Sequence, residues 1–217
     1  MKLHIGNARA AVLVAILGLA MGGTANASVI LSELDLSANR VELVNTGGTT
    51  VDLSSYWWCN RVNGSPRYAV VGSSSTIDAT LSTATSFTVA PGEILVLTLT
   101  DNFLPDINGE LGLYSTSSFS SASSIEDYVL WGASGARDSV AELAGIWTDN
   151  DFIDISGLAA GDSIQLGLGL AGNAVSDYIF APETFGSAQS VPEPGTALLL
   201  LTGLVHLSMR ARLHDRA

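Results

Sequence analysis

Short apolar runs, rich in β-branched residues, recur along the middle of this 217-residue chain and constrain its fold more than any other feature. Several runs alternate apolar with polar residues, which is the pattern of an antiparallel strand with one buried face. Turn-favouring Gly, Asn, Asp and Ser residues separate the runs. Many short strands with little helix favour an all-β fold, an antiparallel β-sandwich. The pattern predicts strands at Val29–Leu34, Arg40–Asn45, Arg67–Val71, Glu93–Thr100, Ile125–Trp131, Ser163–Leu170 and Val175–Phe180.

The segments between the predicted strands contain few helix signals. Residues 72–88 and 115–124 are rich in Ser and Thr, and we expect them to form long loops. Residues 137–147 are predicted to hold one or two helical turns, because Ser139 and Glu142 have the spacing of a capping box.

The N-terminus has the pattern of an export signal. A basic region, an apolar region at residues 10–21 and a pair of small residues follow one another within residues 1–27. The positions concerned are Lys2 and Arg9, then Ala25 and Ala27, with Ser28 directly after them. This order is typical of a secretory signal peptide. We expect cleavage before Ser28 and export across the inner membrane.

The C-terminal residues 191–217 combine a stiff motif, an apolar run and a basic end. The motif is Pro192, Glu193 and Pro194, and the basic end contains Arg210, Arg212 and Arg216. Prolines fix φ and remove N–H donors, so the motif is predicted to be extended. The run at 195–209 is predicted to be a transmembrane helix of roughly 22 Å, against a hydrocarbon core of about 30 Å. It is therefore short for a permanent anchor, and the arginines after it predict a cytoplasmic C-terminus.

These C-terminal residues resemble the PEP-CTERM sorting tail of exported bacterial proteins, in which the same three features follow in the same order. The resemblance implies recognition at Pro192–Pro194 by an exosortase-type membrane peptidase. It also implies a transient membrane anchor through the C-terminal helix, followed by release to the cell surface or the extracellular space.

A second resemblance involves segments that begin in the first predicted strand. The chain contains Ile30–Leu34 (ILSEL), Val41–Asn45 (VELVN), Val51–Trp57 (VDLSSYW) and Val89–Glu93 (VAPGE) in series. This series is similar to the lamin-tail domain, an immunoglobulin-like sandwich. Ser55 stands where that family usually has Gly, and residues 132–180 extend past its ordinary end. We therefore expect a lamin-tail-like domain with an extension at residues 28–180 and a polar linker at 181–190.

The charge of the chain between the two sorting segments narrows its function. Residues 28–190 hold 19 acidic and four basic residues, with a net charge of −15, and contain no lysine and no histidine. Nucleic-acid binding is disfavoured, because phosphate contacts need clustered Lys or Arg. Catalysis by Ser-His-Asp or Cys-His groups is excluded, and so is a histidine-containing zinc site. We therefore predict a protein that is not an enzyme and needs no cofactor.

Carboxylates alone leave two alternatives open. A glycosidase needs only a pair of Asp or Glu residues. The densest acidic cluster contains Asp149, Asp151 and Asp154, and an oxygen-rich loop of this kind is a weak candidate for Ca²⁺. The cluster lacks the register of an EF-hand loop, so a solvated turn is the favoured interpretation.

Several single residues carry expectations about burial. Glu33 and Glu42 lie within predicted strands, and we expect them to point outward or to pair with Arg40. Cys59 cannot form an internal disulfide, because the chain has one cysteine, and its apolar context predicts a buried thiol. One of Trp57 and Trp58 is expected in the core, since neighbours in a strand face opposite ways.

The leading hypothesis is a non-enzymatic, surface-associated protein with a structural or adhesive role at the envelope or in extracellular polysaccharide. The alternative is a secreted carbohydrate-binding or calcium-binding module, or a carboxylate-based glycosidase. Exposed aromatic residues discriminate between them, because glycan-binding surfaces present flat rings. A row containing Trp58, Tyr68 or Trp131 beside carboxylates would favour glycan binding, and buried rings would favour a structural role.

Overall fold

The computed structural model describes residues 28–62, 65–100, 103–148 and 151–187. The predicted signal peptide and the predicted sorting tail lie outside the described residues. The strands are β1 (Val29–Asp35), β2 (Arg40–Asn45), β3 (Val51–Asp52), β4 (Trp57–Val62), β5 (Ser65–Val70), β6 (Ser75–Ile77), β7 (Thr88–Val89), β8 (Ile94–Leu99), β9 (Gly109–Tyr114), β10 (Ile125–Trp131), β11 (Asp162–Leu166) and β12 (Tyr178–Pro182). The helices are α1 (Val71–Ser74), α2 (Asp138–Ala144) and the 3₁₀ turns η1 (Ile155–Gly157) and η2 (Val175–Asp177).

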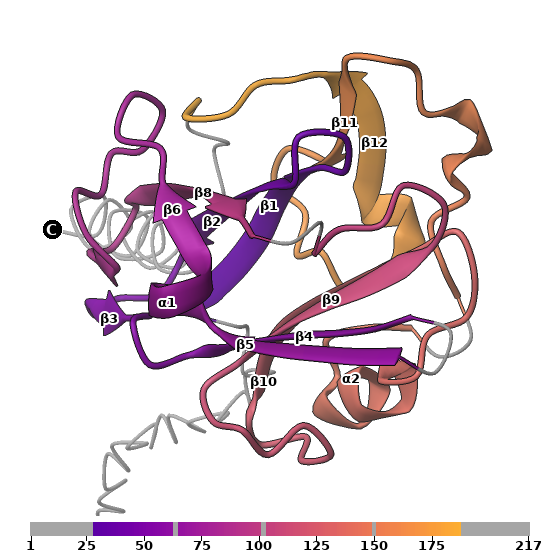
Figure 1. Ribbon diagram of the computed structural model, residues 1–217, viewed down its shortest axis with the longest axis horizontal. Helices are drawn as coiled ribbons and strands as arrows, with labels where there is room; N and C mark the ends of the chain where they lie inside the picture. Colours follow the sequence, from indigo (N-terminus) through magenta and orange to yellow (C-terminus); the bar gives the residue numbers. More distant parts are fainter. Residues whose placement is uncertain (1–27, 63–64, 101–102, 149–150, 188–217) are drawn as a thin grey trace, which may run out of the picture.

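Two main sheets form the layers of the molecule (Figure 1). The larger sheet has the strand order β12-β11-β1-β2-β8-β6, and the smaller has the order β10-β9-β4-β5. A short ribbon pairs β3 with β7. All named strand pairs are antiparallel. The predicted all-β, antiparallel sandwich is confirmed at this level.

The core lies between the sheets, where the longer strands of both layers contribute buried apolar side chains. Trp58 on β4 is fully buried in this core. Its indole Nε1 donates a hydrogen bond of 2.9 Å to the Ser75 hydroxyl on β6, so the ring connects the smaller sheet to the edge of the larger one. The expectation of a core tryptophan is confirmed for Trp58, and Trp57 is only partly buried.

A second connection between the sheets uses a buried carboxyl. The register of β1 with β2 shifts between Leu31 and Glu33, which makes Ser32 the extra residue of a β-bulge. The Leu31 backbone N–H donates to Oδ2 of Asp127 on β10. Asp127 is almost completely buried, and burial raises its pKa to about 7.

Most of the predicted strands are confirmed, with differences at their ends. The strands predicted at Arg40–Asn45 and Ile125–Trp131 have the observed bounds. β11 stops at Leu166, whereas the prediction ran to Leu170, and η2 replaces the first half of the strand predicted at Val175–Phe180. Alternation of apolar residues continues past each true end, but the chain turns there.

Strand β9 has no counterpart among the predicted strands, because two glycines interrupt its apolar pattern. Both positions are glycine because aromatic rings lie against the backbone. A Cβ at Gly109 would lie 2.4 Å from the Trp131 ring, and one at Gly112 would lie 2.6 Å from the Tyr114 ring. Glycine in a strand is thus a sign of close packing at this place.

The Ser/Thr-rich residues 72–88 are not one long loop, which corrects the prediction. They hold most of α1, all of β6 and the first residue of β7, and β6 pairs with β8. The chain after β6 continues along β8, where the Asp78 N–H donates to the Val96 carbonyl and the Thr83 N–H to the Ile94 carbonyl. The hydroxyls of Thr83 and Ser82 accept from the Ile94 and Val96 N–H groups at 2.7 and 2.9 Å, so serine and threonine side chains complete the hydrogen bonding of this sheet edge.

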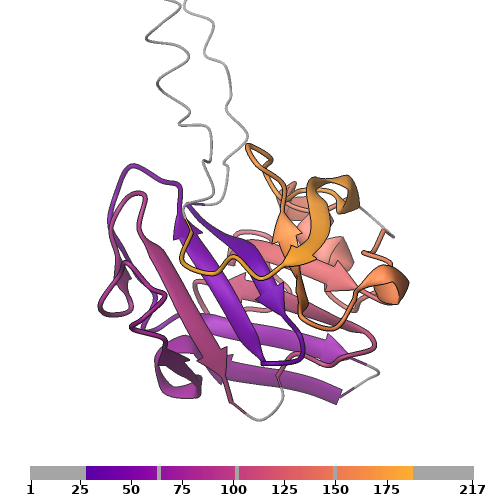
Figure 2. The same cartoon turned by 90° about the horizontal axis from the view of Figure 1, so that it is seen from above.

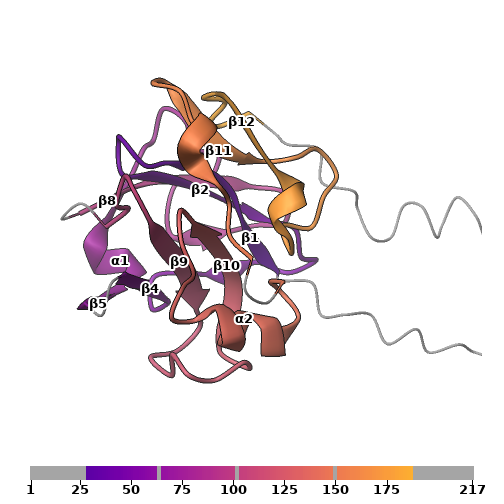
Figure 3. The same ribbon diagram turned by 90° about the vertical axis from the view of Figure 1, so that its right-hand side faces the viewer.

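The helix predicted near residues 137–147 is confirmed as α2, but its predicted cap is wrong. The N-cap is Arg137, which makes no side-chain cap, and the Ser139 N–H is bonded by the neighbouring Asp138 carboxylate. Gly145 ends the helix with a φ of +74°, and its N–H donates to the Ala141 and Glu142 carbonyls. In Figure 3, α2 lies at the opposite end of the molecule from β11 and β12.

The last described residues form an extension of β12, which we name the C-terminal strap, residues 183–187. The strap crosses in front of the larger sheet (Figure 2). Together with residues 181 and 182, which belong to β12, it shows that the packed domain continues seven residues into the range expected to be linker. No described helix is long and apolar enough to cross a membrane, and the predicted span 195–209 lies outside the described residues.

Candidate functional site: a buried carboxylate pair beneath the C-terminal strap

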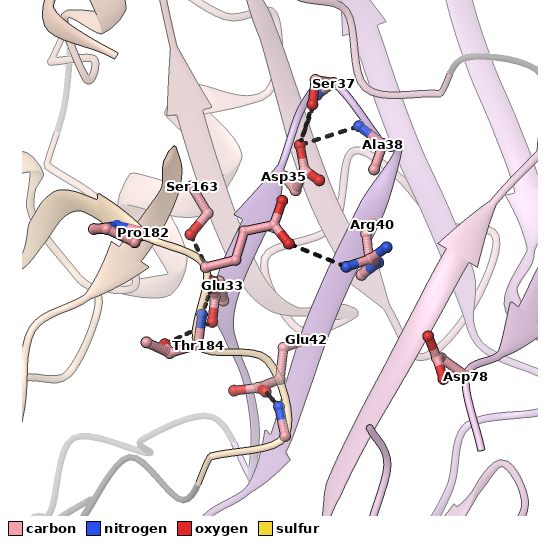
Figure 4. Close-up of polar contacts among 12 residues, drawn as sticks. Glu33, Asp35, Ser37, Ala38, Arg40, Glu42, Asp78, Ser163, Pro182 and Thr184 are labelled. Atoms are coloured by element: carbon pink, nitrogen blue, oxygen red, sulfur yellow. Dashed lines mark hydrogen bonds and ion pairs between the residues drawn. The ribbon is translucent and has the colours of Figure 1, made fainter. Parts of the chain in front are cut away.

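Two glutamates face one another on neighbouring strands of the larger sheet. Glu33 on β1 is the direct cross-strand partner of Glu42 on β2, so their side chains lie on the same face. Both residues are completely buried, which corrects the expectation that they point outward. Neither forms an ion pair with Arg40 among the described residues, because Arg40 pairs with the strap instead. Figure 4 shows both carboxylates beside the strap.

Neutral donors surround the Glu33 carboxylate. Its Oε1 accepts hydrogen bonds from the Ser163 hydroxyl at 2.6 Å, from the Thr184 N–H at 2.9 Å and from the Gln165 amide at 3.3 Å. Its Oε2 accepts from the Thr184 hydroxyl at 3.0 Å. Ser163 and Gln165 lie on β11 and Thr184 lies in the strap, so Glu33 joins three segments that are distant in sequence.

The Glu42 carboxylate has fewer partners. Its Oε1 accepts from the Ser32 hydroxyl at 2.7 Å, and its Oε2 accepts from the Gly186 N–H of the strap at 2.6 Å. Burial raises the pKa of Glu42 to about 7, and the neighbouring Glu33 carboxylate contributes to the rise, whereas the two hydrogen bonds oppose it. The charged form of Glu42 is therefore costly in this environment.

Arg40 fixes the outer side of the strap. Its Nη1 lies 3.2 Å from Oε2 of Glu183, and its guanidinium lies 5.1 Å from the centre of the Phe185 ring. The Phe185 side chain is itself buried. Hydrogen bonding to Asp35, followed by burial, raises the pKa of Glu183. In addition to its hydrogen bonds to Glu33 and Glu42, the strap is thus held by one ion pair, one cation–π contact and one buried ring.

Gly186 is the tightest point of the strap. Its φ is +76°, a conformation that favours glycine, and a Cβ there would lie 2.2 Å from the Leu81 carbonyl oxygen. The segment around Leu81 therefore covers the strap on one side, while Glu42 bonds its N–H on the other. A residue with a Cβ would fit between them only if the backbone moved.

This arrangement holds the chain and leaves the carboxylates closed to a substrate. Both are fully buried, and the groups that touch them are hydroxyls, an amide and backbone N–H groups. A glycosidase pair must flank a bound sugar. These carboxylates can hydrogen-bond the strap, and Glu42 can take up or release a proton.

Another buried carboxyl lies on the smaller sheet. Oε2 of Glu110 accepts from the Tyr128 hydroxyl at 2.7 Å and from the backbone N–H groups of Ala136 and Arg137 at 2.7 and 3.0 Å. Burial raises the pKa of Glu110. Glu110 and Arg61 also line a small pocket of about 30 Å³, which is large enough to hold water. Glu110 therefore serves to fix the loop before α2.

The weak calcium candidates act as local turn residues where they are described. The Asp154 carboxylate accepts from the Ser156 N–H at 3.0 Å and caps η1, and this bond lowers its pKa. The Asp151 carboxylate accepts from the next backbone N–H at 3.1 Å. Asp149 lies outside the described residues. Within the described ranges, no three His, Cys, Asp or Glu residues are grouped so as to hold a metal ion.

The named aromatic residues do not form an exposed row. Trp58 and Trp131 are fully buried. Tyr68 is 38% exposed, and one face of its ring stacks on Phe119 at 4.1 Å between centroids. The predicted burial of Cys59 is confirmed, and burial raises the pKa of its thiol to about 12.

The sorting residues are outside the described ranges, apart from Ser28. Its carbonyl accepts from the Thr46 and Gly47 N–H groups at 2.9 and 3.1 Å, which fastens the start of β1. The residues concerned are Ala25, Ala27, Pro192, Glu193, Pro194, Arg210, Arg212 and Arg216.

Sequence pattern alone did not predict the carboxylate pair, because the alternation within a single strand does not show what covers its glutamate. A signal was present in the sequence, since a tight turn after Asp35 places Glu33 near Glu42 in a hairpin. The polar residues Ser163 and Gln165 then match them on a neighbouring strand. The sequence does not indicate that the strap crosses over these two glutamates.

Comparison with protein-family models, with curated proteins and with solved structures finds no match for this chain.

Proposed function

We propose that this chain is an exported, surface-associated, non-enzymatic protein. Its lamin-tail-like, immunoglobulin-like β-domain is delivered by a signal peptide and sorted by a PEP-CTERM tail. An exosortase-type peptidase processes the tail near Pro192–Pro194. The released domain has a structural or adhesive role at the envelope or in extracellular polysaccharide.

The observation that carries this proposal is that the chain is hydrogen-bonded into the domain close to both expected processing sites. Ser28, the expected first residue after signal cleavage, is hydrogen-bonded to the chain after β2. The strap is fastened as far as Ser187, whose N–H donates to the Thr184 carbonyl at 3.0 Å. Four residues separate Ser187 from Pro192. Cleavage at both sites would therefore leave the packed domain whole.

The acidic surface and the closed carboxylates support a structural role. The chain from 28 to 190 carries a net charge of −15, which favours a well-solvated domain outside the cell. The buried carboxylates of Glu33 and Glu42 bond the chain's own backbone and hydroxyl groups. Their role in the fold requires no bound substrate.

Mass spectrometry of the mature protein from its own host tests the proposal. We expect an N-terminus at Ser28 and a C-terminus near residues 191–195. A variant with Pro192→Ala and Pro194→Ala should retain the tail and stay in the membrane fraction. The matched control Pro91→Ala changes an exposed turn proline and should be processed normally. An intact Ala217 in the wild-type membrane fraction would overturn the proposal.

A further inference from the structure

We propose that the C-terminal strap is a proton-coupled latch, which docks on neutral Glu42 and loosens when Glu42 ionises. The latch is a property of the folded domain. Its consequence for tail processing rests on the function proposed above. As the latch opens, the chain that leads to Pro192 gains freedom.

The geometry makes docking and the charge of Glu42 interdependent. The strap covers the Glu42 carboxylate and replaces water with one backbone N–H, that of Gly186. The other oxygen has only the neutral Ser32 hydroxyl. Burying a carboxylate is costly unless a charged partner compensates it. The Arg40 guanidinium, which could compensate it, is paired with Glu183.

Five other charged residues belong to the segments packed around Glu42, and four of them are acidic; Figure 4 labels Glu33, Asp35, Arg40 and Asp78. Glu33 and Asp35 come from β1, Arg40 from β2, Asp78 from the segment after β6 and Glu183 from the strap. β8 and β11 contribute the uncharged Val96, Ser163 and Gln165. The balance of charge around Glu42 is therefore negative and opposes its ionisation.

The direction in which pH changes docking follows from the pKa of Glu42 in the two states of the strap. When the strap is docked, burial holds the pKa of Glu42 at about 7. When the strap is open, water reaches the carboxylate and its pKa moves toward the ordinary value of 4.5. The docked state therefore holds its proton more tightly. Docking is strongest below pH 4.5, weakens as the pH rises toward 7 and is constant above that.

Opening the latch changes the reach of the sorting motif. With the strap docked to Ser187, five residues lead to Pro192 and span at most about 18 Å. With the strap open back to Pro182, where β12 ends, ten residues span at most about 35 Å. A membrane peptidase would then meet the motif farther from the bulk of the folded domain.

Amide hydrogen exchange of the full chain in detergent micelles tests the latch. The exchange rates of the Thr184 and Gly186 amides are measured between pH 5 and pH 8, after correction for intrinsic chemical exchange. We expect both amides to lose protection by about ten- to a hundredfold over this range, because one pKa unit corresponds to a factor of ten. In Glu42→Gln, whose side chain stays neutral, protection should not change with pH.

The control is Glu142→Gln, which removes an exposed carboxylate on α2 and should keep the wild-type response. Constant protection in the wild type would overturn the latch, and so would a Glu42→Gln variant that retains the pH response.

A direct measurement needs no variant. A pH titration of the Glu42 carboxyl followed by carbon-13 NMR should give a midpoint near 7, and a midpoint near 4.5 would overturn the latch. Neither readout requires the tail to be cut, so failure of tail processing would leave the latch intact.

Discussion

At the scale of single residues, glycines mark the places where this fold leaves no room for a side chain. Gly186 and Gly92 both have a φ near +77°, but their surroundings differ. A Cβ at Gly186 would meet the Leu81 carbonyl, whereas a Cβ at Gly92 would have nothing within 4 Å. Substitutions at the two positions therefore distinguish the cost of backbone strain from the cost of steric overlap.

We predict that Gly186→Ala lowers the free energy of unfolding by more than Gly92→Ala does. A left-handed conformation costs an alanine about 1–2 kcal/mol, which is the whole effect expected at Gly92. At Gly186 the overlap with Leu81 displaces the strap and brings the loss to roughly 2–4 kcal/mol. Urea denaturation of both variants measures the difference. Equal losses would mean that the strap contributes little to stability.

At the scale of elements, the β-bulge in β1 connects the two sheets. The bulge at Ser32 lets the Leu31 N–H bond to Asp127 on β10 of the other sheet. This bond lies inside the core, where water cannot replace a missing partner.

We predict that Asp127→Ala destabilises the domain by about 1–3 kcal/mol, because it leaves the buried Leu31 N–H without an acceptor. Asp127→Asn keeps an oxygen acceptor and should cost less. Asp106→Ala, which removes an exposed carboxylate, is the control and should have almost no effect. Thermal unfolding followed by circular dichroism ranks the three variants. A loss for Asp127→Ala no greater than that of the control would contradict the role of this bond.

At the scale of the whole molecule, buried carboxyls make stability depend on pH. Burial raises the pKa values of Glu42 and Asp127 to about 7 in the folded state. Both groups hold protons more tightly when folded than when unfolded. Their contribution to stability is therefore fully present below their ordinary pKa values and is lost as the pH rises to about 7.

We predict that the free energy of unfolding falls by roughly 4–7 kcal/mol between pH 4.5 and pH 7.5, because the two groups together account for about four pKa units over this interval and each unit is worth about 1.4 kcal/mol. Carboxyls such as Asp52, Asp78 and Asp154, whose pKa values hydrogen bonds lower, act in the opposite direction only at more acidic pH. The double variant Glu42→Gln with Asp127→Asn should flatten the profile. Denaturation at a series of pH values measures it, and stability that rises over this interval would refute the prediction.

The β-domain could be predicted from local pattern where a strand obeys the alternation rule. β1, β2 and β10 were found because their apolar residues alternate within a run bounded by turns. β9 was missed because Gly109 and Gly112 interrupt the run, and β6 was missed because Ser75 and Thr76 resemble a loop. In both strands, packing against a neighbouring element outweighs local preference.

By itself the sequence determined the all-β class, the acidic charge, the buried cysteine and the prediction of two sorting segments. All of these depend on local pattern or on composition. Only the tertiary structure decided that Glu33 and Glu42 face one another in the interior beneath the strap. Burial of a charged residue depends on what crosses above it, and here that cover comes from residues 183–187, about 140 positions farther along the chain.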